Sequence, residues 1–193
     1  MGKKYNTYLS VYPHNNHPNA ALLYVYSVIN LKNMLKKISV FVDVQNIYYT
    51  VRQTFDCHFN YTAFMTEITK GKKLVKAFAY AIDKRDNKQM KFQKILETIG
   101  FEIKLKPFIQ RSDGSAKGDW DVGITIDVLD YAKKSDIIVL ASGDGDFDLL
   151  INKIKNEFHI EVEIYGVTDL TATSLIDAAT RFIPIQGDLL LTD

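Results

Sequence analysis

From residue 36 onward, short apolar runs alternate with longer segments in which apolar residues recur every three or four positions. Such runs are typical of buried strands, and the longer spacing is typical of amphipathic helices. Strands are predicted at 38–43, 74–81, 101–105, 136–141, 161–166 and 182–185. Helices are predicted at 46–55, 61–70, 86–99, 120–133, 146–157 and 170–179, with a loop at 110–118. Because strands and helices alternate, we expect an α/β fold with a mostly parallel sheet.

The apolar spacing in two of these helices predicts which residues face the core. The expected core contacts are Met90, Ile95 and Ile99 in the helix at 86–99, and Val122, Ile126 and Leu129 in the helix at 120–133. In the second helix this arrangement would leave Asp121, in the first turn, pointing toward the ends of the strands.

The first 35 residues do not share the alternation. The Pro- and Asn-rich stretch 13–19 is typical of a loop, and the apolar run 20–29 is too short to cross a bilayer. No small-residue cleavage site follows it. We predict an N-terminal extension over 1–35 and one domain over 36–193. Met34 would lie close to the true start of the domain, and the leader would be an appendage or the product of an upstream start.

Composition limits the classes of protein that remain. The chain has 193 residues, of which 47% are hydrophobic and 24% charged, as in an ordinary globular domain. Its single cysteine, Cys57, excludes an internal disulfide and argues against a cysteine-based zinc site, and the four histidines are scattered. A reducing, cytoplasmic setting is therefore expected.

The net charge of +1 conceals two regions of opposite sign. Residues 70–118 contain 13 Lys and Arg against 5 Asp and Glu, whereas residues 119–193 contain 5 against 15. A metal-dependent enzyme that acts on a polyanion would use an acidic cleft beside a basic surface in this way. The alternative is that the lysines are the solvated faces of ordinary helices.

Acidic residues gather where two predicted strands end. Asp144, Asp146 and Asp148 follow the strand at 136–141, and Asp43 closes the strand at 38–43. If the two strands are neighbours, these carboxylates meet in the crevice where α/β sheets bind ligands. Carboxylates held together repel one another unless a cation lies between them, and an all-oxygen site favours Mg²⁺ or Mn²⁺. The alternative for Asp43, and for one of the three later aspartates, is that it caps the following helix.

Several polar neighbours are candidates for substrate contacts. Asn46 can orient Asp43 or bind a phosphate, or it is simply a residue at a helix start. Lys117 can meet a phosphate or a cleft carboxylate, or it is a plain loop lysine. Asp119 is the expected N-cap of the helix at 120–133, and Asp121 either reaches the crevice or compensates the helix dipole. Asp127 is expected on a solvated helix face, although it is within reach of the cleft.

Aromatic residues offer a further type of contact. Tyr48, Tyr49 and Trp120 can stack on the bases of a single strand, but packing within the protein explains each of them equally well.

With these residues in place, the chain resembles the NYN-domain family, in the LabA-like branch of the PIN-like nuclease superfamily. Four segments carry the resemblance, of which the last is weaker: Phe41–Asn46, Lys117–Asp127, Val139–Phe147 and Ser174–Ile183. It covers about residues 37–186. It implies a three-layer, Rossmann-like sheet that is mostly parallel and flanked by helices. It also implies a metal-dependent ribonuclease or RNA-processing activity.

The resemblance implies that Asp43, Asp121 and Asp144 hold the metal, with Asp146 or Asp148 as the fourth acid. One extra residue between Lys117 and Asp121, compared with some relatives, leaves the roles of Asp119 and Asp121 open. We assign catalysis to Asp43, Asp121, Asp144 and Asp148, metal binding to Asp43, Asp121, Asp144 and Asp146, and substrate contacts to Asn46, Lys117 and Ser142.

The expected reaction is hydrolysis of RNA phosphodiester bonds with Mg²⁺ or Mn²⁺, in RNA processing or turnover. The expected partner is single-stranded RNA, without membrane contact, and a homodimer is left open. One rival is a nucleic-acid- or partner-binding module with a weak or lost catalytic site. Another is a phosphotransfer or phosphatase domain, whose Asp-x-Asp-Gly-Thr signature does not follow the first strand.

Overall fold

The computed structural model describes residues 35–83, 87–107, 109–110, 116–117 and 119–191. The predicted N-terminal extension lies outside the described residues, apart from its last position, and therefore stays a prediction. Among the described residues, no helix combines the length and the apolar character needed to cross a membrane.

The core of the domain is a six-stranded sheet in the order β4-β3-β1-β7-β8-β9, and every pair of neighbours is parallel. Its strands are β1 (Lys37–Asp43), β3 (Lys73–Asp83), β4 (Glu102–Pro107), β7 (Ile137–Ala141), β8 (Glu161–Gly166) and β9 (Arg181–Pro184). The first strand, β1, lies in the middle of the sheet. From it the chain runs outward through β3 to β4, and it then returns to the middle and continues outward from β7. The strand order therefore reverses between β1 and β7, and such a switch point opens a crevice at the carboxyl ends of the two strands.

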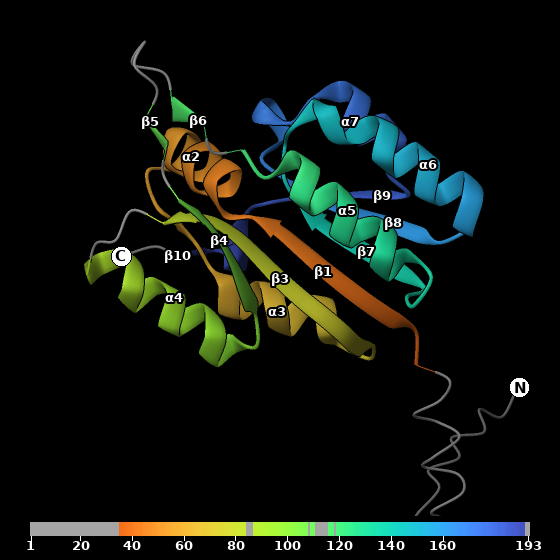
Figure 1. Ribbon diagram of the computed structural model, residues 1–193, viewed down its shortest axis with the longest axis horizontal. Helices are drawn as coiled ribbons and strands as arrows, with labels where there is room; N and C mark the ends of the chain where they lie inside the picture. Colours follow the sequence, from red (N-terminus) through yellow and green to blue (C-terminus); the bar gives the residue numbers. More distant parts are fainter. Residues whose placement is uncertain (1–34, 84–86, 108, 111–115, 118, 192–193) are drawn as a thin grey trace, which may run out of the picture. The chain divides into compact units, whose positions relative to one another are not determined.

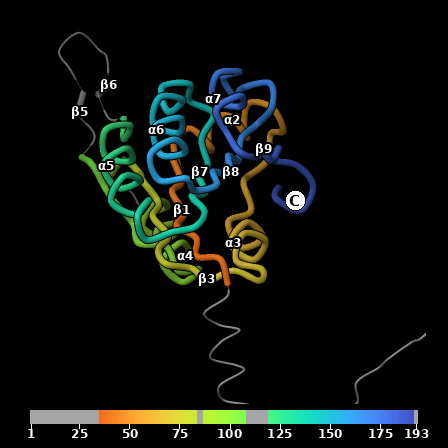
Figure 2. Tube along the Cα trace, turned by 90° about the vertical axis from the view of Figure 1, so that its right-hand side faces the viewer, coloured from red at the N-terminus to blue at the C-terminus, as the bar shows by residue number. Residues whose placement is uncertain are grey.

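Helices cover both faces of the sheet (Figure 1). They are α2 (Val44–Phe55), α3 (Tyr61–Thr69), α4 (Asn87–Ile99), α5 (Asp121–Ala132), α6 (Asp148–Phe158) and α7 (Thr173–Ala178). The first three pack on one face, where they meet Val40 and Val42, and the last three pack on the other, where they meet Phe41. In Figure 2, β1 and β7 run between α3 on one side and α5 on the other. The predicted three-layer α/β fold is confirmed.

Short elements complete the domain. The 3₁₀ turns are η1 (Gly145–Phe147), η2 (Thr168–Leu170) and η3 (Gly187–Leu189), and two small antiparallel pairs join β2 (His58–Phe59) to β10 (Leu190–Leu191) and β5 (Ile109–Gln110) to β6 (Ala116–Lys117). Each predicted strand and helix is present, with ends shifted by a few residues. Within the predicted loop at 110–118, the described residues belong to the β5–β6 pair.

The inward faces predicted for two helices are wrong for four of their six residues, and Ile99 and Leu129 do pack against the core. Met90, Ile95, Val122 and Ile126 are each more than half exposed, whereas Ile99 and Leu129 are partly buried. The buried residues are Leu96 in α4 and Ile124, Val128 and Ala132 in α5. Because α5 carries apolar residues around most of its circumference, their spacing alone does not select one side. Tertiary contacts select it.

Trp120 holds the start of α5 in its observed rotation. Its Nε1 donates to the carbonyl oxygen of Ala81 at 2.9 Å. Its ring lies so close to Gly123 that a Cβ added there would be 2.6 Å from the indole. The indole therefore fixes the first turn of the helix against β3 and decides which apolar residues enter the core.

Candidate active site at the carboxyl ends of β1 and β7

Asp43 is the last residue of β1 and also the N-cap of α2. Its Oδ1 accepts the backbone N–H of Asn46 at 3.0 Å. The residue is 8% exposed, so most of its surface is shielded from water. The capping role that the sequence offered as the alternative is therefore present, and it places a buried carboxylate at the switch point of the sheet.

The loop after β7 reaches the same level of the sheet. Val42 lies opposite Ala141 in the register of β1 and β7, so the residues that follow them emerge side by side. Asn46 joins the two strand ends, because its Oδ1 accepts the N–H of Gly143 at 2.9 Å. Asn46 thus orients the loop that carries Asp144, a role that the sequence did not indicate.

Asp144 is held by its own loop. Its backbone N–H donates to the Oγ of Ser142 at 3.2 Å, and its Oδ1 accepts the N–H of Asp146 at 3.0 Å. Ser142 is fully buried. Since its hydroxyl oxygen is used within the loop, Ser142 positions Asp144, and this geometry does not support the substrate contact that we predicted for it.

Gly143 is required by close packing. A Cβ at this position would lie 2.6 Å from the carbonyl oxygen of Leu170, and the Gly143 carbonyl accepts the N–H of Ala172 at 3.0 Å. The backbone φ of Gly143 is not positive, so its conformation is open to other residues and does not by itself require glycine. The segment around Leu170 thus presses directly on the loop that carries Asp144, and only glycine leaves room for it.

The charges of the site act on one another. The pKa of Asp43 is raised to about 6, first by burial and then by the carboxylates of Asp121 and Asp144, against the lowering effect of the Asn46 N–H. The pKa of Asp121 is also raised, first by burial and then by the negative charges of Asp144, Asp119 and Asp146. Carboxylates that act on one another's pKa lie in one region of space. That Asp43, Asp121 and Asp144 share one metal site stays a prediction.

Asp119 does not cap α5 as we predicted. The N-cap is Trp120, which makes no side-chain capping bond. Asp119 is exposed, and its carbonyl oxygen accepts from Lys106 Nζ at 2.7 Å. The same ammonium lies 4.5 Å from the centroid of the Trp120 ring, and it lowers the pKa of Asp121.

Lys106 is therefore a cation at the edge of the acidic group. From the sequence, Lys106 was visible only as part of the basic region 70–118. The alternation of Lys104 and Lys106 along β4 marks two lysines on one side of the strand. That signal was available in the sequence, but it did not reveal which carboxylates the lysines meet.

Three other candidates take separate places. Asp127 accepts from Lys104 Nζ at 2.6 Å and from the hydroxyl of Tyr80 at 2.7 Å, so its carboxylate is committed away from the site. Asp148 begins α6 and is not among the charges that raise the pKa of Asp43 or Asp121. Lys117 lies in β6, and its side chain is outside the described residues.

The donors suit a hard divalent cation in their chemistry, because they are all carboxylate oxygens. Within the described residues, no three His, Cys, Asp or Glu side chains are grouped so as to hold a metal ion. Mg²⁺ does not require such a cage, since it keeps several waters and is often bound through one or two carboxylates. The residues thus fit Mg²⁺ or Mn²⁺ bound partly through water.

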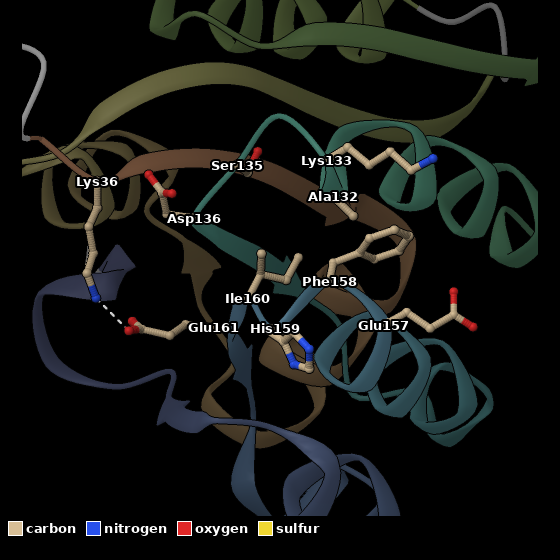
Figure 3. Close-up of a pocket in the computed structure, with 10 residues that line it drawn as sticks. All are labelled: Lys36, Ala132, Lys133, Ser135, Asp136, Glu157, Phe158, His159, Ile160 and Glu161. Carbon is tan, nitrogen blue, oxygen red and sulfur yellow. Dashed lines mark hydrogen bonds and ion pairs between the residues drawn. The ribbon is translucent and has the colours of Figure 1, made fainter.

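A separate cavity of about 590 Å³ opens at the opposite, amino ends of the strands (Figure 3). It is lined by residues that precede or begin β1, β7 and β8, among them Lys36, Asp136 and Glu161. Lys36 and Glu161 form an ion pair at 2.5 Å. The lining of the cavity carries both positive and negative charges, and it includes none of the aspartates at the switch point.

Comparison with known proteins agrees with this architecture. The family model for the NYN domain matches residues 37–186. The chain belongs to the NYN domain family. This family lies within a nuclease superfamily, and the resemblance read from the sequence is confirmed.

Two relatives show how far the similarity of this NYN domain extends. The low amplitude and bright protein LabA of Synechococcus elongatus is 28% identical over 161 residues, which cover 78% of this chain and 84% of LabA. The crystal structure of a protein of unknown function from Vibrio parahaemolyticus is 50% identical, with a TM-score of 0.78. That match covers 81% of this chain and 97% of the Vibrio chain.

Proposed function

We propose that the chain is a metal-dependent ribonuclease that hydrolyses RNA phosphodiester bonds, in RNA processing or turnover. The observation that carries this proposal is the buried Asp43, whose pKa is raised to about 6 by burial and then by Asp121 and Asp144. A buried carboxylate beside others of like charge, at the switch point of a parallel sheet, is typical of a functional site. Membership of the NYN family supports a nuclease in particular.

Asp43, Asp121 and Asp144 would hold Mg²⁺ or Mn²⁺, some of them through water. When bound, such an ion supplies charge stabilisation at the phosphate and lowers the pKa of water. Asp146 is the better candidate for the fourth acid, because its charge is among the main causes that raise the pKa of Asp121. This assignment chooses between the two alternatives that the sequence left open.

The protein's own groups orient the site and its substrate. The N–H of Asn46 fixes Asp43, and the Asn46 side chain fixes the loop that carries Asp144. Without a cation, the pKa of about 6 leaves the Asp43 carboxylate mostly ionised at neutral pH, as metal binding requires. Lys106, beside Asp119, is placed to meet a backbone phosphate at the rim.

The test uses a labelled single-stranded RNA and the purified protein. Cleavage is expected in Mn²⁺ or Mg²⁺ and is expected to stop in EDTA. Asp144→Asn should lower the cleavage rate by about 100-fold or more, because a removed transition-state contact costs that much in other enzymes. Asp146→Asn should have a larger effect than Asp148→Asn.

The matched control is Asp177→Asn, which removes an exposed aspartate from α7. It should cleave like the parent. If Asp144→Asn also cleaves like the parent, the site is misassigned. RNA binding that persists in EDTA, with no cleavage in any divalent cation, would instead favour the rival binding module. The lack of a preformed three-ligand group among the described residues makes that outcome worth testing.

A further inference from the structure

Three exposed aromatic rings contact one another on the surface of α2 and β2. Tyr48 and Tyr49 in α2 are each about half exposed, and their ring centroids lie 5.3 Å apart, edge to face. Tyr48 also stacks on the exposed His58 of β2, at 6.3 Å between centroids and 28° between ring planes. Tyr48, Tyr49 and His58 are called the aromatic row below.

The aromatic row does not belong to the core of the domain. The buried residues of α2 are Val44, Ile47 and Val51. Tyr49 lies on the opposite side of the helix, and Tyr48 lies at the border of the buried side, where its ring is still half exposed. Other tyrosines of the chain, such as Tyr80 and Tyr165, are fully buried and donate hydrogen bonds to carboxylates. Packing in the core, which was the alternative explanation from the sequence, therefore does not account for Tyr48 and Tyr49.

The position of the row relates it to the acids. Asp43 is the N-cap of α2, so Tyr48 and Tyr49 follow it by five and six residues on one rigid helix. At about 1.5 Å per residue, they lie roughly 7 to 9 Å further along the helix axis. This distance corresponds to roughly two or three stacked nucleotides, at about 3.4 Å each.

We propose that the aromatic row is a base-stacking subsite for single-stranded RNA, which holds the nucleotides next to the phosphate at Asp43. This inference rests on the proposed function, which places a phosphate of the RNA strand at Asp43. Every base presents a π face, so a row of exposed rings binds a single strand with little regard to sequence. The paired bases of a duplex do not offer those faces, which predicts a preference for single strands.

Trp120 is a weaker candidate for the same role. Its ring already carries the Lys106 ammonium on one side and packs on Gly123, and its Nε1 is bonded to the Ala81 carbonyl. It belongs to the start of α5, which covers the other face of the sheet from α2. Tyr48 and Tyr49 are less constrained. Among the described residues, their rings contact only each other and the exposed ring of His58.

The test measures binding without cleavage. Fluorescence anisotropy with a labelled single-stranded RNA of about twelve nucleotides is recorded in EDTA, which keeps the probe intact. Tyr49→Ala and Tyr48→Ala should each weaken binding by about fivefold or more. Tyr49→Phe should bind like the parent, because it keeps the ring. Met90→Ala removes an exposed apolar side chain from α4 and is the matched control.

A second probe separates stacking from charge. A strand of the same length with abasic sugars in its central positions keeps the phosphates and lacks the bases. It should bind the parent more weakly, and Tyr49→Ala should then cause no further loss. Binding of the normal strand by Tyr49→Ala and Tyr48→Ala within about twofold of the parent would overturn the proposal. So would a change in oligomeric state, by light scattering, without a change in RNA binding.

The two proposals fail in different ways. If RNA binding depends on the tyrosines but no divalent cation yields cleavage, the stacking subsite stands and the nuclease fails. If the parent cleaves RNA but the tyrosine variants bind and cleave normally, the nuclease stands and the subsite fails. Circular dichroism of each variant confirms that its fold is retained.

Discussion

The charge of Asp43 is expected to destabilise the folded protein at neutral pH, and Asp43→Asn tests this directly. The substitution removes the ionisable group and keeps an oxygen that can accept the N–H of Asn46 as the present cap does. Asp43→Ala would remove the cap as well, which would confuse the two effects. The asparagine variant therefore isolates the electrostatic contribution.

The magnitude follows from the pKa of Asp43, which rises from 3.8 to about 6 on folding. A change of one pKa unit corresponds to about 1.4 kcal/mol, so the ionised group costs the fold up to about 3 kcal/mol. The folded state holds this proton more tightly than the unfolded chain does. Its contribution to stability is therefore present below pH 3.8 and is lost as the pH rises through about 6.

The assay is urea unfolding in EDTA, followed by circular dichroism, at about pH 7.5 and about pH 4.5. Asp43→Asn should be more stable than the parent by about 1 to 3 kcal/mol at the higher pH, since burial of the new amide offsets part of the gain. The advantage should shrink at the lower pH. Asp177→Asn, at an exposed position of α7, should change stability by less than about 0.5 kcal/mol at either pH.

Two results would refute this reasoning. One is a variant that is less stable than the parent at about pH 7.5. The other is an advantage of the same size at both values of pH, because the effect would then not come from ionisation of Asp43. Added Mg²⁺ gives an independent reading, since a cation at the site should stabilise the parent more than the variant.

Three further substitutions test how the site is supported. Gly143→Ala should destabilise the fold by about 1 to 3 kcal/mol in urea unfolding, because its Cβ would lie 2.6 Å from the Leu170 carbonyl oxygen; unchanged stability would mean that the Leu170 segment yields easily. Asn46→Ala should cost about 1 to 3 kcal/mol by the same assay, because it leaves the Gly143 N–H without its acceptor, and it should also slow any RNA cleavage. Lys104→Met should cost about 2 kcal/mol in thermal or urea unfolding, because Asp127, with a side chain 14% exposed, loses its ion pair; a variant as stable as the parent would show that water replaces the ammonium.

Local patterns predicted the elements and two of the acids well. A run of apolar residues that ends in Asp43, and another that leads into Asp144, are visible without any knowledge of strand order. Their meeting depended on whether the two strands were neighbours. The observed order, with β1 beside β7, supplies that condition.

The inward faces of helices were harder to predict. The spacing in α5 was compatible with a stripe through Val122 and Ile126, yet both are exposed, because the indole of Trp120 packs on Gly123 and fixes the rotation of the helix. Asp127 was expected on a solvated face. It instead accepts from Lys104, a residue of a different strand that no local pattern links to it.

What the sequence determined by itself was the kind of chain: alternating strands and helices, and acids placed where strands end, because periodicity and strand ends are properties of neighbouring residues. The tertiary structure decided which of those acids act on one another. Asp43, Asp121 and Asp144 repel one another, whereas Asp127 is neutralised by Lys104. Electrostatic interactions depend on distance through space and on burial, and both are set only when segments far apart in the chain pack together.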